Sequence, residues 1–294
     1  MQKILAILQL TRANNLLIMW ATLALSYYCL TDYVTTDDLL APRFVLLCCC
    51  VLLTAAAGYI INDYLDINID LTNKPNKVII GKHVSRRWAM LLHFIFNVTA
   101  IVGGFVLSAY LALTILLCTV ALWLYSVHFK KQFLSGNVLV ALLSAFVIAI
   151  LPLFNRSISG YLVAVYALFA FGLTLIREIV KDAEDLRGDS KFNCRTLPIV
   201  LGIRKTKRIL ITLVLVYVVL ITSHIFIGNS QIPFRHFYGN VLYVIYMLLF
   251  VAVPLVATTY LLYRADVKSD FTRLSALYKI IMVAGLVSMA IIKV

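Results

Sequence analysis

Long stretches without charged residues limit most strongly what this chain of 294 residues can fold into. One of them runs uncharged from Phe44 to Tyr59, and several reach the ~20 apolar residues that an α-helix needs to cross a bilayer. They do not alternate apolar and polar residues, as the strands of a membrane barrel would. We therefore expect an all-α integral membrane protein with nine transmembrane helices, at about 14–33, 43–62, 88–108, 109–127, 137–155, 160–178, 209–228, 240–262 and 275–293.

The composition excludes a soluble globular protein. Only 13% of the residues are charged, about half of the ~25% found in soluble domains. No linker is long enough to separate domains, and no cleavable signal peptide is evident before the first span. We expect a single polytopic membrane domain over residues 1–294, with Met1–Leu10 as an amphipathic lead-in that lies on the membrane.

The basic residues are divided very unevenly between the two sides of the nine expected spans. The net charge is +13, and one side carries nearly all of the excess, with Lys3, Arg12, Lys74, Lys77, Lys82, Arg86, Arg87, Lys130, Lys131, the cluster 181–208, Arg264, Lys268 and Arg273. The positive-inside rule makes this side cytoplasmic, together with the N-terminus. The charge thus reports membrane topology, and we expect no nucleic-acid partner.

Eight of the thirteen acidic residues lie in two short stretches at the ends of expected spans, on the same basic side. One stretch is "NDYLDINID" (62–70) and the other is "REIVKDAEDLRGD" (177–189). If each helix continues through its stretch, Asn62, Asp63, Asp66 and Asp70 fall within about a quarter of the helix circumference. Glu178, Asp182, Asp185 and Asp189 likewise share one face, whereas Glu184 points to the opposite side. We exclude Glu184 from the site, and Gly188 is a candidate end of the second helix.

Carboxylates gathered near hydrocarbon need cations to pair with them. Oxygen ligands without histidine or cysteine favour Mg²⁺ or Mn²⁺, and Mg²⁺ usually completes its shell with substrate phosphates. Basic residues that would suit phosphates lie beside the acidic ones, namely Lys74, Lys77, Lys130, Lys131, Arg177 and Lys181. Carboxylates that suit a metal ion and cationic side chains that suit phosphate lie together at a membrane surface. This combination indicates an isoprenoid or lipid diphosphate as substrate.

These stretches resemble the two aspartate-rich motifs of the UbiA superfamily of intramembrane prenyltransferases. Between them, "NKPNKVIIGKHVS" (73–85) and "LYSVHFKK" (124–131) resemble two further family segments, and "RTLPIVLG" (195–202) resembles the one after the second motif. The matches keep the family order from about residue 60 to 202. Lys77 and Val78 stand where many members have Arg-Pro, which weakens the match in that loop.

The resemblance implies nine helices in a horseshoe around a central cavity, with a metal-binding cap on the cytoplasmic side. It implies Mg²⁺-dependent transfer of a prenyl group from a prenyl diphosphate to a lipid or aromatic acceptor in the membrane, with no obligate protein partner. The implied metal ligands are Asn62, Asp66 and Asp70, with Asp63 in support, and Asp182, Asp185 and Asp189. The implied diphosphate ligands are Lys74, Lys77, Lys130, Arg177 and Lys181. Asp66, Asp185 and Tyr125 form the implied catalytic centre, where the Tyr125 ring would face the allylic cation.

Members of this family differ in the acceptor that they prenylate. The second motif most resembles the members that prenylate the hydroxyl of geranylgeranylglyceryl phosphate to make ether lipids. Aromatic prenyltransferases of menaquinone- or ubiquinone-type synthesis share much of this stretch and remain the alternative. Two other classes fit less well. A transporter would place its carboxylates near the bilayer midplane, and a CDP-alcohol phosphotransferase would have glycine rather than Tyr64 after Asp63.

Overall fold

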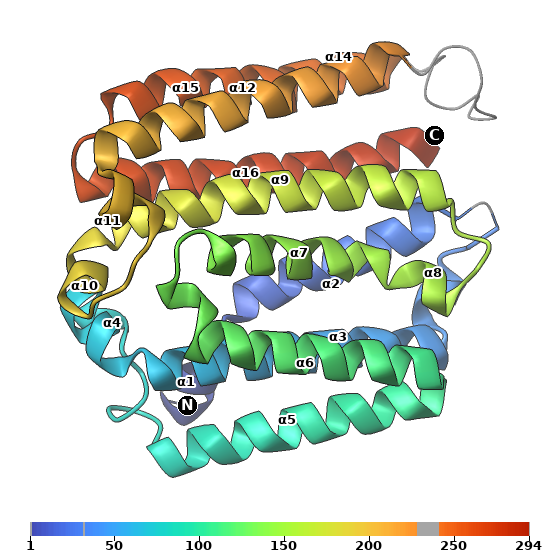
Figure 1. Ribbon diagram of the computed structural model, residues 1–294. Helices are drawn as coiled ribbons and strands as arrows, with labels where there is room; N and C mark the ends of the chain where they lie inside the picture. Colours follow the sequence, from blue (N-terminus) through green and yellow to red (C-terminus); the bar gives the residue numbers. More distant parts are fainter. Residues whose placement is uncertain (1, 32, 228–240, 294) are drawn as a thin grey trace.

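Nearly every residue described by the computed structural model, which covers 2–31, 33–227 and 241–293, lies in a helix (Figure 1). The long helices are α2 (Ala13–Cys29), α3 (Pro42–Leu65), α5 (Arg86–Leu107), α6 (Ala109–Val127), α7 (Ser135–Ala149), α9 (Gly160–Glu184), α12 (Ile203–Ile227), α15 (Val253–Arg264) and α16 (Lys268–Lys293). The short ones are α1 (Gln2–Leu10), α4 (Ile67–Asn73), α8 (Leu151–Phe154), α10 (Leu186–Lys191), α11 (Leu197–Leu201) and α14 (Val241–Met247). The long helices lie side by side, and α1, α4, α10 and α11 gather at one end of the bundle.

The helices account for the spans expected from sequence. Within the described ranges, eight helical segments are long and apolar enough to cross a membrane, counting α7 with α8 and α14 with α15 as one each. Helices α1 and α2 form a bent pair, with an angle of 60° between them, and counting this pair as one span brings the number to nine. The chain is thus an all-α integral membrane protein, as predicted.

Serine residues set the start of three of these helices. Ser85 and Ser159 precede α5 and α9, and each accepts a hydrogen bond from the backbone N–H three residues on. Ser108 separates α5 from α6 in an extended conformation and caps α6 by accepting from the N–H of Leu111 at 3.2 Å. A serine at this position satisfies a backbone donor that the first helical turn leaves free. The break expected at 108/109 therefore lies at Ser108.

Proline interrupts two of the expected spans. Proline has no backbone N–H to donate and crowds the preceding turn. Pro152 lies where α7 gives way to α8, and Pro254 follows a π-helical turn, η4 (Leu248–Ala252), which joins α14 to α15. Both spans are therefore broken helices rather than the continuous ones that the hydropathy indicated.

The N-terminal segment is a helix docked on the bundle. Arg12 adopts a left-handed conformation (φ 53°, ψ 54°) between α1 and α2 and so turns the chain. Ala6 and Leu10 are buried in a small apolar cluster with Ile60, Ile80, Val84 and Ala89. Ile4, Leu5 and Leu8 of α1 are exposed, and Leu5 and Leu8 line the opening of the central cavity. The bend brings Arg12 and the first turn of α2 to the interior of the bundle.

A cavity of about 1260 Å³ lies at the centre of the bundle. The cavity is lined by residues from α1, α2, α3, α6, α7, α9, α12, α14, η4 and α16, and α4 and α10 contribute at one end. Helices α5 and α15, both fully described, contribute no side chain to its wall and lie at opposite edges of the bundle in Figure 1. Apolar side chains form its deeper part, and the acidic stretches form one end.

Candidate functional site

Each acidic stretch is a bent helix whose bend lies at its middle aspartate. Helix α3 ends at Leu65 and α4 begins at Ile67, with Asp66 between them at φ −95° and ψ 3°. Helix α9 ends at Glu184 and α10 begins at Leu186, with Asp185 between them at φ −96° and ψ 10°. The assumption of one continuous helix through each motif was therefore wrong.

Hydrogen bonds nevertheless preserve the four-residue spacing across each bend. The N–H of Asp66 donates to the carbonyl of Asn62 at 3.0 Å, and that of Asp70 donates to Asp66 at 2.8 Å. In the second motif Asp185 donates to Lys181 at 2.9 Å and Asp189 donates to Asp185 at 3.2 Å. Because i to i−4 bonds continue on both sides of the bend, carboxylates four residues apart remain on one face. The two motifs thus share one local structure.

Helices α4 and α10 dock directly on each other through Asn73 and Gly188. The N–H of Gly188 donates to Asn73 Oδ1 at 2.8 Å, and a Cβ at position 188 would lie only 2.3 Å from Asn73 Nδ2. Lys268 Nζ also donates to the carbonyl of Asn73 at 2.7 Å, which ties α16 to the same point. Gly188 therefore lies within α10 and permits this close approach; it does not end the helix.

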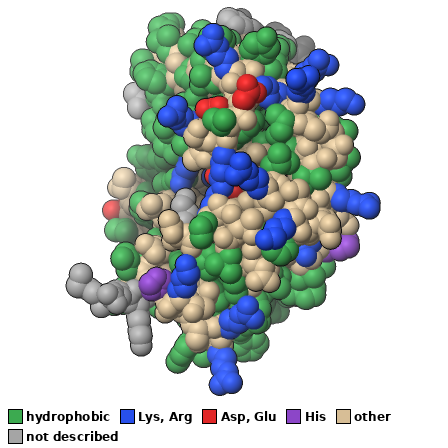
Figure 2. Space-filling view, turned by 90° about the vertical axis from the view of Figure 1, so that its left-hand side faces the viewer, with side chains coloured by type: hydrophobic (Ala, Val, Ile, Leu, Met, Phe, Trp, Pro, Cys, Tyr) green, Lys and Arg blue, Asp and Glu red, His purple; other side chains and the backbone are tan. Residues whose placement is uncertain are grey.

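The structure brings the residues predicted from sequence to one cavity. Its lining includes Asn62, Asp63, Asp66, Asp70, Lys74, Tyr125, Lys130, Arg177, Lys181, Asp182, Asp185 and Asp189. The side chain of Lys77 lies outside the part of the chain that is described. Figure 2 shows the end of the molecule above these residues, where Lys and Arg side chains spread over the surface with few acidic ones visible between them.

Lysines from other segments pair with both middle aspartates. Lys130, from the turn after α6, forms an ion pair with Asp66. Lys74 Nζ lies 2.8 Å from Asp185 Oδ2 and 3.3 Å from Glu184 Oε1. Glu184 does not line the cavity, as predicted, but it is not remote from the site, because the bend after α9 turns it toward Lys74. Periodicity alone missed this contact, since the helix ends at Glu184.

Two further polar residues belong to the site: Glu178, which the sequence placed on the second acidic face without a role, and Asn137, which was not predicted. Glu178 Oε1 accepts from Lys181 Nζ at 2.7 Å and from Arg177 Nη1 at 3.1 Å, so it holds two cations at the cavity wall. Asn137 Nδ2 donates to Asp182 Oδ2 at 2.8 Å. An asparagine in the first turn of an otherwise apolar span was the available signal for Asn137.

Burial raises the pKa of the last aspartate in each acidic motif, Asp70 and Asp189. Burial, reinforced by the charge of Asp63, raises the pKa of Asp70 to about 6. Burial and the neighbouring carboxylate of Asp185 raise the pKa of Asp189 to about 7. Both groups are therefore poised to lose a proton when a cation approaches.

The oxygen atoms of the site suit a hard divalent cation. Asn62 Oδ1 and Asp185 Oδ1 are buried and accept no hydrogen bond within the described residues. Over the same residues, no three Asp, Glu, His or Cys side chains converge into a complete metal site. Amide and carboxylate oxygens of this kind are the ligands that Mg²⁺ takes together with water and substrate phosphates.

Comparison with solved structures places the fold among known membrane proteins. A structure reported for digeranylgeranylglyceryl phosphate synthase superposes with a TM-score of 0.69 at 23% identity, and the match covers 100% of both chains. A UbiA homolog from Archaeoglobus fulgidus bound to GPP and Mg²⁺ superposes with a TM-score of 0.62 at 15% identity, covering 97% of this chain and 99% of the other. These similarities establish a shared fold.

Sequence comparison extends over nearly the whole chain. Digeranylgeranylglyceryl phosphate synthase from Sulfurisphaera tokodaii is 30% identical over 271 residues, covering 90% of this chain and 89% of that protein. The protein of the same name from Methanosphaera stadtmanae is 29% identical over 237 residues, covering 80% and 82%. The family model "UbiA prenyltransferase family" matches residues 15–281. The chain belongs to the UbiA prenyltransferase family.

Proposed function

We propose that this enzyme transfers a geranylgeranyl group from its diphosphate to the free hydroxyl of geranylgeranylglyceryl phosphate, the second ether-forming step of an isoprenoid ether lipid. The observation that supports a prenyl diphosphate as donor is the pair of bent acidic helices beside lysines, at the polar end of a large and mostly apolar cavity. Similarity over 90% of the chain to a synthase of that product supports the acceptor.

We propose that Mg²⁺ is held by Asn62, Asp66 and Asp70, with Asp63 in support, and by Asp182, Asp185 and Asp189. When bound, the metal neutralises the charge that develops on the departing diphosphate. Lys74, Lys130, Arg177 and Lys181 line the same end and would bind the remaining phosphate oxygens. Lys77 belongs to this proposal from its sequence position alone.

The chain's own residues then organise the transfer. The apolar wall would hold the prenyl tail and exclude water from the reactive allylic carbon, and the Tyr125 ring would face that carbon as positive charge develops. The C–O bond to the diphosphate breaks, and its electron pair leaves with the diphosphate. The acceptor oxygen forms the new C–O bond and its hydroxyl proton is released. We also propose that residues 1–294 form one domain, with the basic end and the N-terminus cytoplasmic.

A transfer assay tests this function. Purified enzyme with Mg²⁺ and labelled geranylgeranyl diphosphate is offered geranylgeranylglyceryl phosphate, 4-hydroxybenzoate or dihydroxynaphthoate. We expect label in the ether phospholipid, because the similarity to the synthases spans both motifs. Label in an aromatic product would replace the acceptor with a quinone precursor, and no transfer to any of the three would contradict the proposal.

Removing the metal should stop transfer reversibly. EDTA is expected to abolish activity, because the diphosphate then leaves without charge neutralisation, and excess Mg²⁺ should restore it. Retained activity in EDTA would exclude this role for Mg²⁺.

The affinity for Mg²⁺ should fall as the pH is lowered from 8 to 6. Asp70 and Asp189 have raised pKa values of about 6 and 7, so they take up protons in this window and must release them to bind metal. We expect the Mg²⁺ concentration for half-maximal activity to rise by about tenfold or more. Mg²⁺ titrations of activity at the two pH values measure it, and an unchanged midpoint would contradict the metal role of these carboxylates.

A further inference from the structure

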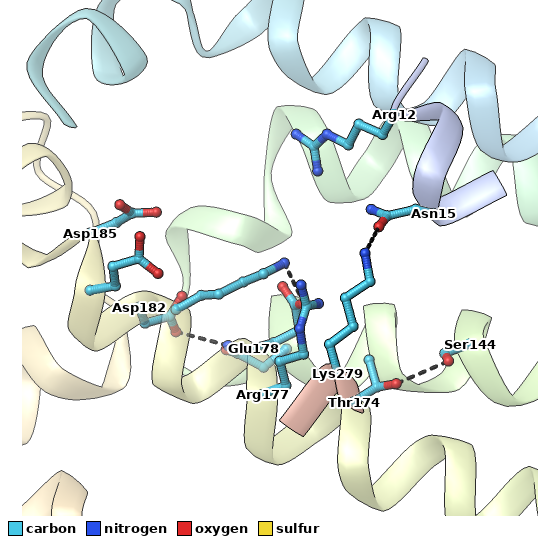
Figure 3. Close-up of polar contacts among 12 residues, drawn as sticks. Arg12, Asn15, Ser144, Thr174, Arg177, Glu178, Asp182, Asp185 and Lys279 are labelled. Atoms are coloured by element: carbon cyan, nitrogen blue, oxygen red, sulfur yellow. Dashed lines mark hydrogen bonds and ion pairs between the residues drawn. The ribbon is translucent and has the colours of Figure 1, made fainter. Parts of the chain in front are cut away.

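A second group of cations lines the cavity beyond the two acidic motifs. Arg12 reaches it from the bend between α1 and α2, Arg177 and Lys181 come from α9, and Lys279 comes from α16. Figure 3 shows Arg12, Arg177 and Lys279 with their charged ends directed toward a common space, and Asp185 to one side. We call Arg12, Arg177 and Lys279, together with the side-chain amide of Asn15, the inner basic group.

Lys279 is the least expected member, because it lies within a membrane span. It is eleven residues from the start of α16, about 16 Å along the helix. Its ammonium does not extend toward the interface as a snorkelling lysine would; Nζ donates to Asn15 Oδ1 at 2.7 Å and the residue lines the cavity. Among the described residues no carboxylate lies within ion-pair distance of it. An ionisable side chain in such a place, paired only with a neutral amide, indicates a function.

The carboxylates nearby do not balance these cations. Asp63 pairs with Arg12 at 2.7 Å, and Glu178 alone serves both Arg177 and Lys181. Four cations thus face two carboxylates, which leaves an excess of two positive charges. Arg177 Nε is also buried without a hydrogen-bond partner in the described structure. The group therefore has both charge and a donor available for an anion that the protein does not supply.

A phosphate monoester matches this excess. It carries about −1.5 to −2 charges near pH 7 and offers several acceptor oxygens. The acidic motifs with Mg²⁺ and the lysines beside them would hold the donor's diphosphate. Arg12 and Lys279 have no part in that site and remain for a different anion, and Arg177 would contact both anions. We propose that Lys279, with Arg177, Arg12 and the amide of Asn15, binds the phosphate of the acceptor and thereby selects a phosphorylated glycerol lipid. This inference rests on the proposed function, because it assigns a binding site to the acceptor named there.

The test compares two acceptors that differ only in the phosphate. Wild-type enzyme and Lys279→Met are assayed with geranylgeranylglyceryl phosphate and with geranylgeranylglycerol, which has the same hydroxyl and tail. We expect Lys279→Met to lower kcat/KM for the phosphorylated acceptor at least tenfold through a raised KM, and to leave the neutral acceptor and the KM of the donor unchanged. Lys279→Arg, which keeps the charge, should retain most of the preference.

Other outcomes overturn the assignment. An equal loss with both acceptors would make Lys279 a structural residue, and a raised KM for the donor would place it in the diphosphate site. Lys205→Met on α12, an exposed lysine outside the cavity, is the matched control and should behave as wild type.

The inner basic group can also be judged if the proposed function fails. If the wild type prenylates neither glycerol acceptor, the ether-lipid function is wrong. Equilibrium binding of geranylgeranylglyceryl phosphate to wild type and Lys279→Met, without donor, then decides the subsite separately. Binding weakened at least tenfold by the substitution would keep it, and equal affinity or no binding to the wild type would overturn it.

Discussion

Replacing Asp66 or Asp185 with alanine should reduce prenyl transfer by on the order of 100- to 1000-fold or more, while the protein remains folded in the membrane. Each residue lies at the bend of an acidic motif and pairs with a lysine from another segment. Its loss removes a proposed metal ligand and leaves the developing charge of the diphosphate less neutralised. The measurement is kcat/KM at saturating Mg²⁺, with detergent-solubilised protein checked by gel filtration.

Glu184→Ala provides the matched control for Asp185→Ala. The two carboxylates are adjacent and both contact Lys74, at 3.3 and 2.8 Å, but only Asp185 lines the cavity. We expect a loss of no more than a few-fold for Glu184→Ala, because Lys74 keeps its shorter contact with Asp185 at 2.8 Å and no proposed metal ligand is removed. Equal losses in the two variants would mean that Asp185 acts by orienting Lys74 and not as a metal ligand.

Gly188→Val should also impair transfer strongly, by on the order of 100-fold, because misplacement of reacting groups by about 1 Å costs that much. A side chain at 188 would meet Asn73, whose Cγ lies 2.5 Å from the ideal Cβ position. The clash separates α4 from α10 and so moves Asp70 away from Asp189. Activity and the midpoint of Mg²⁺ titration measure the effect, and we expect both to change.

The loss of activity should depend on where the replaced glycine lies, and not on the replacement of a glycine by valine as such. Gly160, in the first turn of α9, has nothing within 4 Å of a Cβ, so Gly160→Val serves as the control and should retain activity. A Gly188→Val enzyme with wild-type activity would show that α4 and α10 need not touch for transfer.

The sequence alone determined the class of fold and supplied most of the residues proposed for the site. Apolar length specified the spans, because hydrocarbon leaves a backbone no partner but its own helix. Charge near a membrane is costly, so two acidic stretches at the ends of spans indicated a functional site. Of the thirteen residues predicted for that site, twelve line one cavity, and the side chain of the thirteenth, Lys77, lies outside the described part of the chain. The break at Ser108 was also readable from the sequence, at a residue suited to cap the next helix.

Only the tertiary structure decided how these residues meet. The bends at Asp66 and Asp185 are invisible to a count of 100° per residue, and they turn Glu184 toward Lys74. The contact of Asn73 with Gly188 joins positions 115 residues apart, and that of Lys279 with Asn15 joins positions 264 apart. Local patterns report which residues tolerate lipid or need a counter-ion, whereas partners so distant in sequence are chosen by helix packing. The inner basic group exists only because that packing brings both ends of the chain to one cavity.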